Sequence, residues 1–207
     1  GLVRPAAGLL LEPAQQDAVR FEPFFLNLML REMAAALGLS RTVATGEAVA
    51  AALGPQAEPI AAAKAMVLSL WLAERLHARG ELPATTPAQH YASFLAGSLR
   101  SLQLDPAGPM AQARLLVLNH CRDRGAIVRD AATGRYRVDP AQMPAALEAL
   151  AAQLLTLEGS GDRAGAAELL DYGARLRAEL AADLERLAAA GLPDRVVFIQ
   201  GEDLLGL

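Results

Sequence analysis

The chain has 207 residues, of which 53% are hydrophobic and only 4% aromatic, and its net charge at pH 7 is −4. This length suits one domain with its own core, and the alanine-rich composition favours closely packed helices. The negative charge gives no electrostatic basis for binding DNA, RNA or an anionic membrane. Cys121 is the single cysteine, which excludes an intrachain disulfide and predicts a reducing, cytoplasmic setting. No apolar run is long enough for a membrane span.

The first 20 residues are predicted to form an irregular N-terminal arm, because Pro5 and Pro13 interrupt a short apolar run. Residues 21–207 are predicted to form a single helical domain. Its first helix is expected to run from Phe21 to about Leu37, with Gly38 as the C-cap. Apolar residues three or four positions apart predict one broad buried stripe on this helix: Phe24, Phe25, Leu28, Leu30, Met33 and Leu37.

Apolar periodicity and capping residues predict further helices at 47–53, 58–79, 90–102, 112–123, 141–157, 164–173 and 174–190. Thr86 is a suitable N-cap, and Pro87 a suitable first residue, for the helix that includes residues 90–102. The turn at 131–134, between two short β-prone runs, predicts a β-hairpin, and residues 195–201 predict a short strand. The fold class is therefore mainly α, with one β-hairpin and a short C-terminal strand.

The stretch FEPFFLNLMLREMAAALG, residues 21–38, resembles the helix that carries the HExxH zinc motif in the dipeptidyl peptidase III family, most closely its bacterial relatives. In this alignment Arg31 and Ala35 replace the two His ligands, whereas Glu32 and Gly38 are retained. HExxH binds zinc because residues four apart share a helix face, so two imidazoles meet one ion. Arg31 has no lone pair to donate and Ala35 has no donor atom. No metal or other cofactor is therefore expected.

The resemblance continues along the chain. Lys64-Ala65 and the run Gly80–Pro83 match a family segment that places the third zinc ligand, a glutamate, at Ala62. A gap placed later in the alignment puts that ligand at Glu58 instead, and both alternatives stay open. Arg100-Ser101-Leu102 matches the opening of a family R-S-x-R-F-G stretch. The match spans roughly residues 20–200 and covers only the helical lobe, so the lobe that closes the peptide cleft has no counterpart in it.

Two functions follow from these residues. The first is a catalytically inactive pseudo-peptidase domain that serves as a binding or assembly module, with another protein chain or a small ligand in the former active-site cleft. Arg31 would then neutralise Glu32 and Glu58 in place of the lost metal. The second is a metal-independent enzyme in which Glu32 acts as acid or base, while Arg31 and Arg100 bind an anionic substrate.

Two other hypotheses need different groups. A zinc site built from His77, His90 and His120 would have spacings that match no standard site. A subunit that completes its fold with a second chain carrying the missing lobe would form an oligomer. No catalytic residue is expected, and the residues predicted to bind a ligand are Arg31, Glu32, Glu58 and Arg100.

Overall fold

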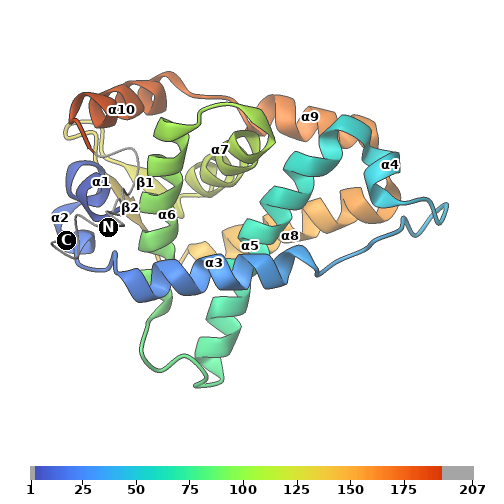
Figure 1. Cartoon of the computed structure of the whole chain (residues 1–207), viewed down its shortest axis with the longest axis horizontal. Coiled ribbons are helices and arrows are strands. Elements are labelled where there is room, and N and C mark those ends of the chain that lie inside the picture. Colours follow the sequence, from blue (N-terminus) through green and yellow to red (C-terminus); the bar gives the residue numbers. More distant parts are fainter. Residues whose placement is uncertain (1–2, 193–207) are drawn as a thin grey trace, which may run out of the picture.

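The computed structural model describes residues 3–192. Figure 1 shows the helices and the two strands along the chain. Their bounds are α1 Val3–Leu10, α2 Pro13–Gln16, α3 Phe21–Ala35, α4 Val49–Leu53, the 3₁₀ turn η1 Gly54–Gln56, α5 Ala57–Ala78, α6 Pro87–Leu104, α7 Gly108–Asp123, β1 Ile127–Arg129, β2 Tyr136–Val138, α8 Met143–Ser160, α9 Arg163–Gly173 and α10 Ala178–Ala189. The expected mainly helical class with one hairpin is confirmed, and the expected strand at 195–201 lies outside the described residues.

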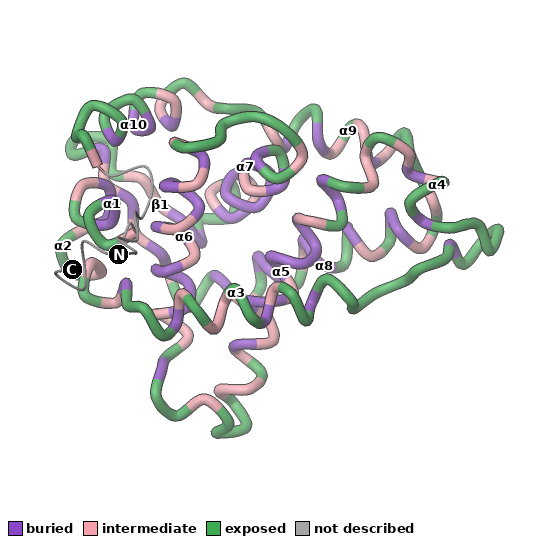
Figure 2. Tube along the Cα trace, viewed as in Figure 1, coloured by how far each residue is buried: buried purple, intermediate pink, exposed green. Residues whose placement is uncertain are grey.

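Helix α5 is the central element of the domain. It packs against α3, α7 and α8, and it is apolar on nearly every side, as a helix enclosed by other helices should be. Its many alanines let α3 approach closely. Figure 2 shows that α5, α6 and α7 are largely buried, whereas α3, which crosses in front of α5 and α6, is exposed along much of its length. Within the described residues, no helix combines the length and hydrophobicity that a membrane crossing needs.

The N-terminal residues are not an irregular arm, so that prediction was wrong. They form α1 and α2, and Ala6, Ala7 and Leu10 of α1 are fully buried. Pro5 is compatible with this helix because it lies in the first turn, where no intrahelical N–H bond is needed. Leu11 extends the hairpin through a parallel bridge to Tyr136. The start of the chain is therefore part of the core.

The apolar residues of α3 do not form a buried stripe, which corrects a second prediction. Among the six residues of that stripe only Leu30 is buried. Phe25, Met33 and Leu37 are 47%, 62% and 45% exposed, and Phe21 is 78% exposed. The helix also ends at Ala35, earlier than expected. Helix α3 thus presents an apolar face to solvent, which soluble domains normally cover.

A buried ion pair between α5 and α8 lies beside the chain that follows α3. The Lys64 Nζ atom lies 2.9 Å from Oε1 and 3.0 Å from Oε2 of Glu158, and both side chains are almost fully buried. Gly38 has a φ of 106°, and a Cβ atom there would come within 2.8 Å of the Lys64 Nζ atom. Gly38 is therefore required for its left-handed backbone and to leave room for the ammonium group.

The hairpin and α10 cover the opposite end of the bundle. The strands pair antiparallel, with Ile127 opposite Val138, as the predicted turn required. Asp183 of α10 is buried against the hairpin, where it accepts bonds from Arg129 at 2.7 and 2.9 Å and from the Tyr136 hydroxyl at 2.7 Å. These bonds tie the last described helix to the sheet. The Arg129 guanidinium and the Tyr136 hydroxyl hold the Asp183 pKa below its usual value, against the effect of burial.

Candidate functional site

Helix α3 places the two altered motif positions one turn apart, at Arg31 and Ala35. The Arg31 side chain is 27% exposed, and its Nη2 atom lies 2.9 Å from Oε1 of Glu32. The Glu32 side chain is 73% exposed, so this ion pair lies at the surface. Arg31 therefore has its carboxylate partner on the solvent side and also lines the pocket below.

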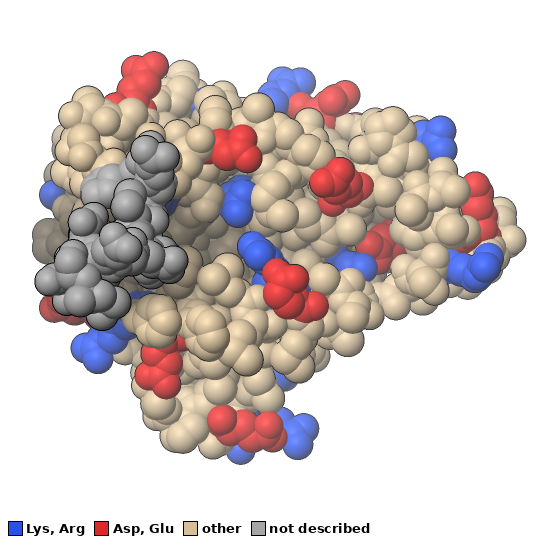
Figure 3. Space-filling model, in the orientation of Figure 1, with Lys and Arg blue, Asp and Glu red and all other residues tan. Residues whose placement is uncertain are grey.

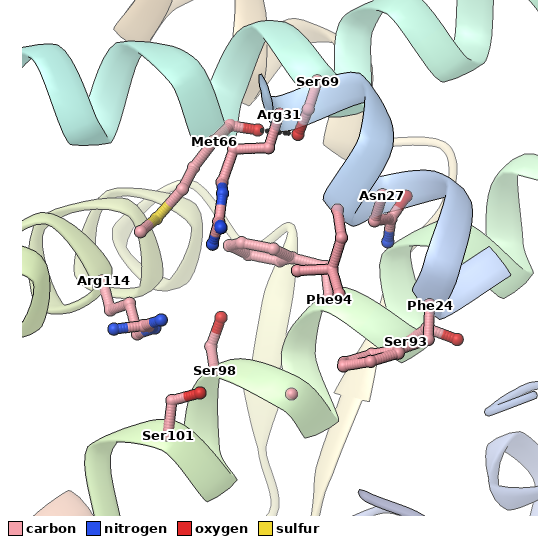
Figure 4. A pocket seen from close by; sticks show the side chains of 12 residues that line it. Phe24, Asn27, Arg31, Met66, Ser69, Ser93, Phe94, Ser98, Ser101 and Arg114 are labelled. Atoms are coloured by element: carbon pink, nitrogen blue, oxygen red, sulfur yellow. Dashed lines mark hydrogen bonds between the residues drawn. The ribbon is translucent and has the colours of Figure 1, made fainter. Parts of the chain in front are cut away.

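A pocket of about 100 Å³ lies among α3, α5, α6 and α7. Figure 4 shows its lining side chains, and Figure 3 shows basic side chains beside a hollow in the same face of the molecule. Its walls are Phe24, Asn27, Leu28, Arg31, Met66, Ser69, Ser93, Phe94, Gly97, Ser98, Ser101 and Arg114. Gly97 leaves room for the ring of Phe24, because a Cβ atom would come within 3.3 Å of it.

The pocket has one polar end. In Figure 4 the guanidinium groups of Arg31 and Arg114 and the hydroxyls of Ser98 and Ser101 point toward a common space. Phe24 and Phe94 lie on its other side and supply an apolar wall. Four hydrogen-bond donors beside an apolar surface are typical of a small-ligand site.

Of the two charged groups at the polar end, Arg31 is paired with Glu32, and Arg114 is not paired with any described residue. Arg114 donates a long 3.5 Å bond to the Met110 carbonyl and makes no ion pair within the described part of the chain. Burial and the positive charge of Arg31 both lower its pKa, and the charge of Asp105 opposes them. The pocket therefore brings two like charges close together, an arrangement that costs free energy unless an anion lies between them.

The comparisons with known proteins identify the fold. DPP III from Caldithrix abyssi has a TM-score of 0.89 and 26% identity over 94% of this chain. Dipeptidyl-peptidase III from Corallococcus sp. strain EGB has a TM-score of 0.85 and 32% identity over 95% of this chain. The fold of the chain resembles the helical lobe of dipeptidyl-peptidase III. The chain spans only 37% and 36% of those two chains.

This dipeptidyl-peptidase III-like chain also matches part of one curated protein. "Nudix hydrolase 3" of Arabidopsis thaliana is 27% identical over 195 residues, which is 93% of this chain and 25% of that protein. No protein-family model matches the chain. The resemblance seen in the sequence is thus confirmed for the fold, and it concerns one lobe of a larger architecture.

The side chains of this lobe do not fit the zinc ion that the peptidase fold implies. Arg31, which the sequence alignment places at the first histidine of the motif, carries a permanent positive charge and no free lone pair. Ala35, which it places at the second, offers only a methyl group. In the part of the chain that the structure describes, no three His, Cys, Asp or Glu side chains are grouped so that they could hold a metal ion.

The other predicted site residues lie away from the pocket. Glu58 is exposed in the first turn of α5, eight residues before Met66, or about 12 Å along the helix axis. Arg100 is buried and donates to Gln103 and to the Leu192 carbonyl. Neither residue lines the pocket. The structure therefore brings Arg31 and Glu32 together but not Glu58 or Arg100.

The residues that sequence reasoning missed are Arg114 and the α6 hydroxyls. Ser93 and Ser98 lie five positions apart, and Ser98 and Ser101 lie three apart, so with Gly97 they line one side of α6 that spans about 140°. That spacing of small residues was the sequence signal that could have identified this wall of the pocket. The family match pointed to Arg100, whereas its neighbour Ser101, about 100° further around the helix, lines the pocket.

Two of the three histidines lie together in a chain of hydrogen bonds beside the pocket. The His90 Nδ1 atom lies 2.7 Å from Oδ1 of Asn27, and its Nε2 atom lies 2.9 Å from Oγ1 of Thr85. His77 Nε2 lies 3.2 Å from the same Thr85 hydroxyl. Burial and the nearby His77 lower the His90 pKa to about 4. His90 therefore serves as a neutral core residue that orients Asn27.

The third histidine lies apart from these two. His120 is on α7 and donates to the Ala146 carbonyl at 3.1 Å. Its neighbour Cys121 is buried, which raises the pKa of that thiol to about 12, so the thiolate that nucleophilic chemistry needs is suppressed.

Proposed function

We propose that this dipeptidyl-peptidase III-like lobe is a zinc-free binding module and not a peptidase. The observation that carries the proposal is the chemistry of the two motif positions on α3. Arg31 offers a fixed cation and Ala35 a methyl group where a zinc peptidase needs two imidazoles. The helix that once positioned zinc ligands is retained, so its surviving role is to hold the pocket and the face around it.

The exposed face of α3 supports binding as the retained role. Phe21, Phe25 and Met33 are 78%, 47% and 62% exposed, on the helix that also carries Arg31. The rings of Phe21 and Phe25 stack at 5.7 Å. A run of exposed apolar side chains on one helix marks an interaction surface. The proposed partner is a second protein segment that covers this face, on the same polypeptide or on another.

The alternative, a metal-independent enzyme with Glu32 as acid or base, has less support. Its carboxylate is 73% exposed and bonded to Arg31 at the surface, and a general acid or base needs to reach a bound substrate. Arg100, the second group proposed to hold an anionic substrate, does not line the pocket.

A hydrolysis assay separates these functions. We expect the purified chain to release no product from dipeptidyl arylamides above the buffer rate, with or without added Zn²⁺. The measurement is arylamine release over hours at high protein concentration, with the Glu32→Gln variant in parallel. Zinc-dependent release that the variant abolishes would contradict the proposal. Zinc-independent release that the variant abolishes would establish the metal-free enzyme instead.

A further inference from the structure

The polar end of the pocket is built for a negatively charged oxygen group. We infer that this pocket binds the oxyanion group of a small molecule, a phosphate or a carboxylate, between the guanidinium groups of Arg31 and Arg114. This inference rests on the proposed binding function and names the ligand class. It also gives Arg31 a role: the substitution that removed a zinc ligand supplied an anion ligand.

The donors suit an oxyanion in kind and number. Guanidinium groups bind carboxylate and phosphate through paired N–H donors, more strongly than neutral donors do. The hydroxyls of Ser98 and Ser101 point into the same space (Figure 4), and neither donates to another group in the described part of the chain. Two fixed charges and two free hydroxyls can therefore serve the oxygens of a single anionic group.

Ser93 lines the end of the pocket opposite the two guanidinium groups, and Figure 4 shows its hydroxyl beyond the ring of Phe24. Ser93 is fully buried. Among the residues that the structure describes, its Oγ atom has no hydrogen-bond partner. A buried hydroxyl without a partner is uncommon, because it loses its bonds to water without replacement. Asn27, held through His90, adds an amide to the same wall.

The size and lining of the pocket limit the ligand. Its volume of about 100 Å³ suits an anionic group with a short apolar attachment. Phe24, Leu28 and Phe94 would contact that attachment. The ion pair of Arg31 with Glu32 lies toward solvent, which leaves the inner edge of the guanidinium for the ligand.

Calorimetric titration tests the inference with two probes, inorganic phosphate and acetate, at constant ionic strength and pH 7. We expect saturable binding of at least one probe at one site, and the stronger probe identifies the anionic group. Arg114→Gln should weaken that binding roughly tenfold or more, because a charged hydrogen-bond partner is lost. Arg114→Lys, which keeps the charge but not the paired donors, should restore part of it.

Arg79→Gln is the matched control. It removes the same charge from the end of α5, where Arg79 is exposed and bonded to Glu81 at 2.7 Å, and it should leave the affinity unchanged. Circular dichroism confirms that each variant is folded. Absence of binding for both probes would overturn the inference, as would equal affinity in the wild type and in both Arg114 variants. Neither result bears on zinc binding. The proposed zinc-free function is therefore tested independently, by the hydrolysis assay.

Discussion

Lys64→Met is expected to lower the free energy of unfolding by about 3–5 kcal/mol. The Lys64 ammonium group contacts both oxygens of Glu158, and the two side chains are 6% and 2% exposed. Removal of the cation leaves a buried carboxylate without its counter-charge, which costs more than the ion pair contributes. Urea unfolding followed by circular dichroism measures the loss.

The same two helices provide the control for this prediction. Arg75 and Glu148 also join α5 to α8, at 3.1 Å, but both side chains are more than half exposed. Arg75→Gln should therefore cost less than about 1 kcal/mol. The double variant Lys64→Met/Glu158→Leu should recover part of the loss, since the unpaired charge is gone. Equal losses for Lys64→Met and Arg75→Gln would show that the buried pair contributes no more than the exposed pair to holding α8 on α5.

Acid should destabilise the domain through His90. Its pKa is about 4 when folded and about 6.5 when unfolded, so between these values the unfolded chain binds the proton more readily. The free energy of unfolding therefore falls as the pH falls from 6.5, by about 3 kcal/mol at pH 4. The lowered pKa of His120 acts in the same direction.

Urea unfolding at pH 7, 6, 5 and 4.5 measures this dependence, and His90→Gln is the informative variant. We expect the variant to be less stable at pH 7, because the bonds to Asn27 and Thr85 are disturbed, and to lose stability less steeply as the pH falls. Carboxylates with a lowered pKa, such as Asp183, contribute mainly below this range. An unchanged slope in the variant would rule out His90 as the main cause.

Much of the fold was predictable from local signals. Thr86 starts α6 with a capping box completed by Gln89, and the turn before Gly134 sets the hairpin. Helix α1 was missed because Pro5 looked like a helix breaker, whereas it occupies a first turn that tolerates it.

The burial of α3 was mispredicted for a different reason. A spacing of three to four residues shows that apolar side chains share a face, but it does not show what covers that face. Here α5 and α6 cover Leu30 and Ala34, while Phe25 and Met33 face solvent. The chain matches only 37% and 36% of the two dipeptidyl-peptidase III chains.

The candidate site was predictable only in part. The alignment with the HExxH motif singled out Arg31 and Ala35, and helix geometry places them on one face because they are four residues apart. Arg114 is 83 positions further along the chain, and the packing of both α3 and α7 against α5 brings it to Arg31. Arg100 and Glu58 were chosen from the alignment, which does not reveal on which side of α6 or at which level of α5 a side chain lies.

The zinc content of the purified chain tests the central claim most directly. Elemental analysis before and after incubation with Zn²⁺ and washing should give less than about a tenth of an equivalent, since neither altered motif position offers a lone pair. Arg31→His/Ala35→His/Ala62→Glu, which also keeps Glu58 and so offers a glutamate at both alternative positions of the third ligand, provides the positive comparison and should retain close to one equivalent. Near one tightly held equivalent in the unaltered chain would contradict the account, because a metal site would then exist among residues assigned here to other roles.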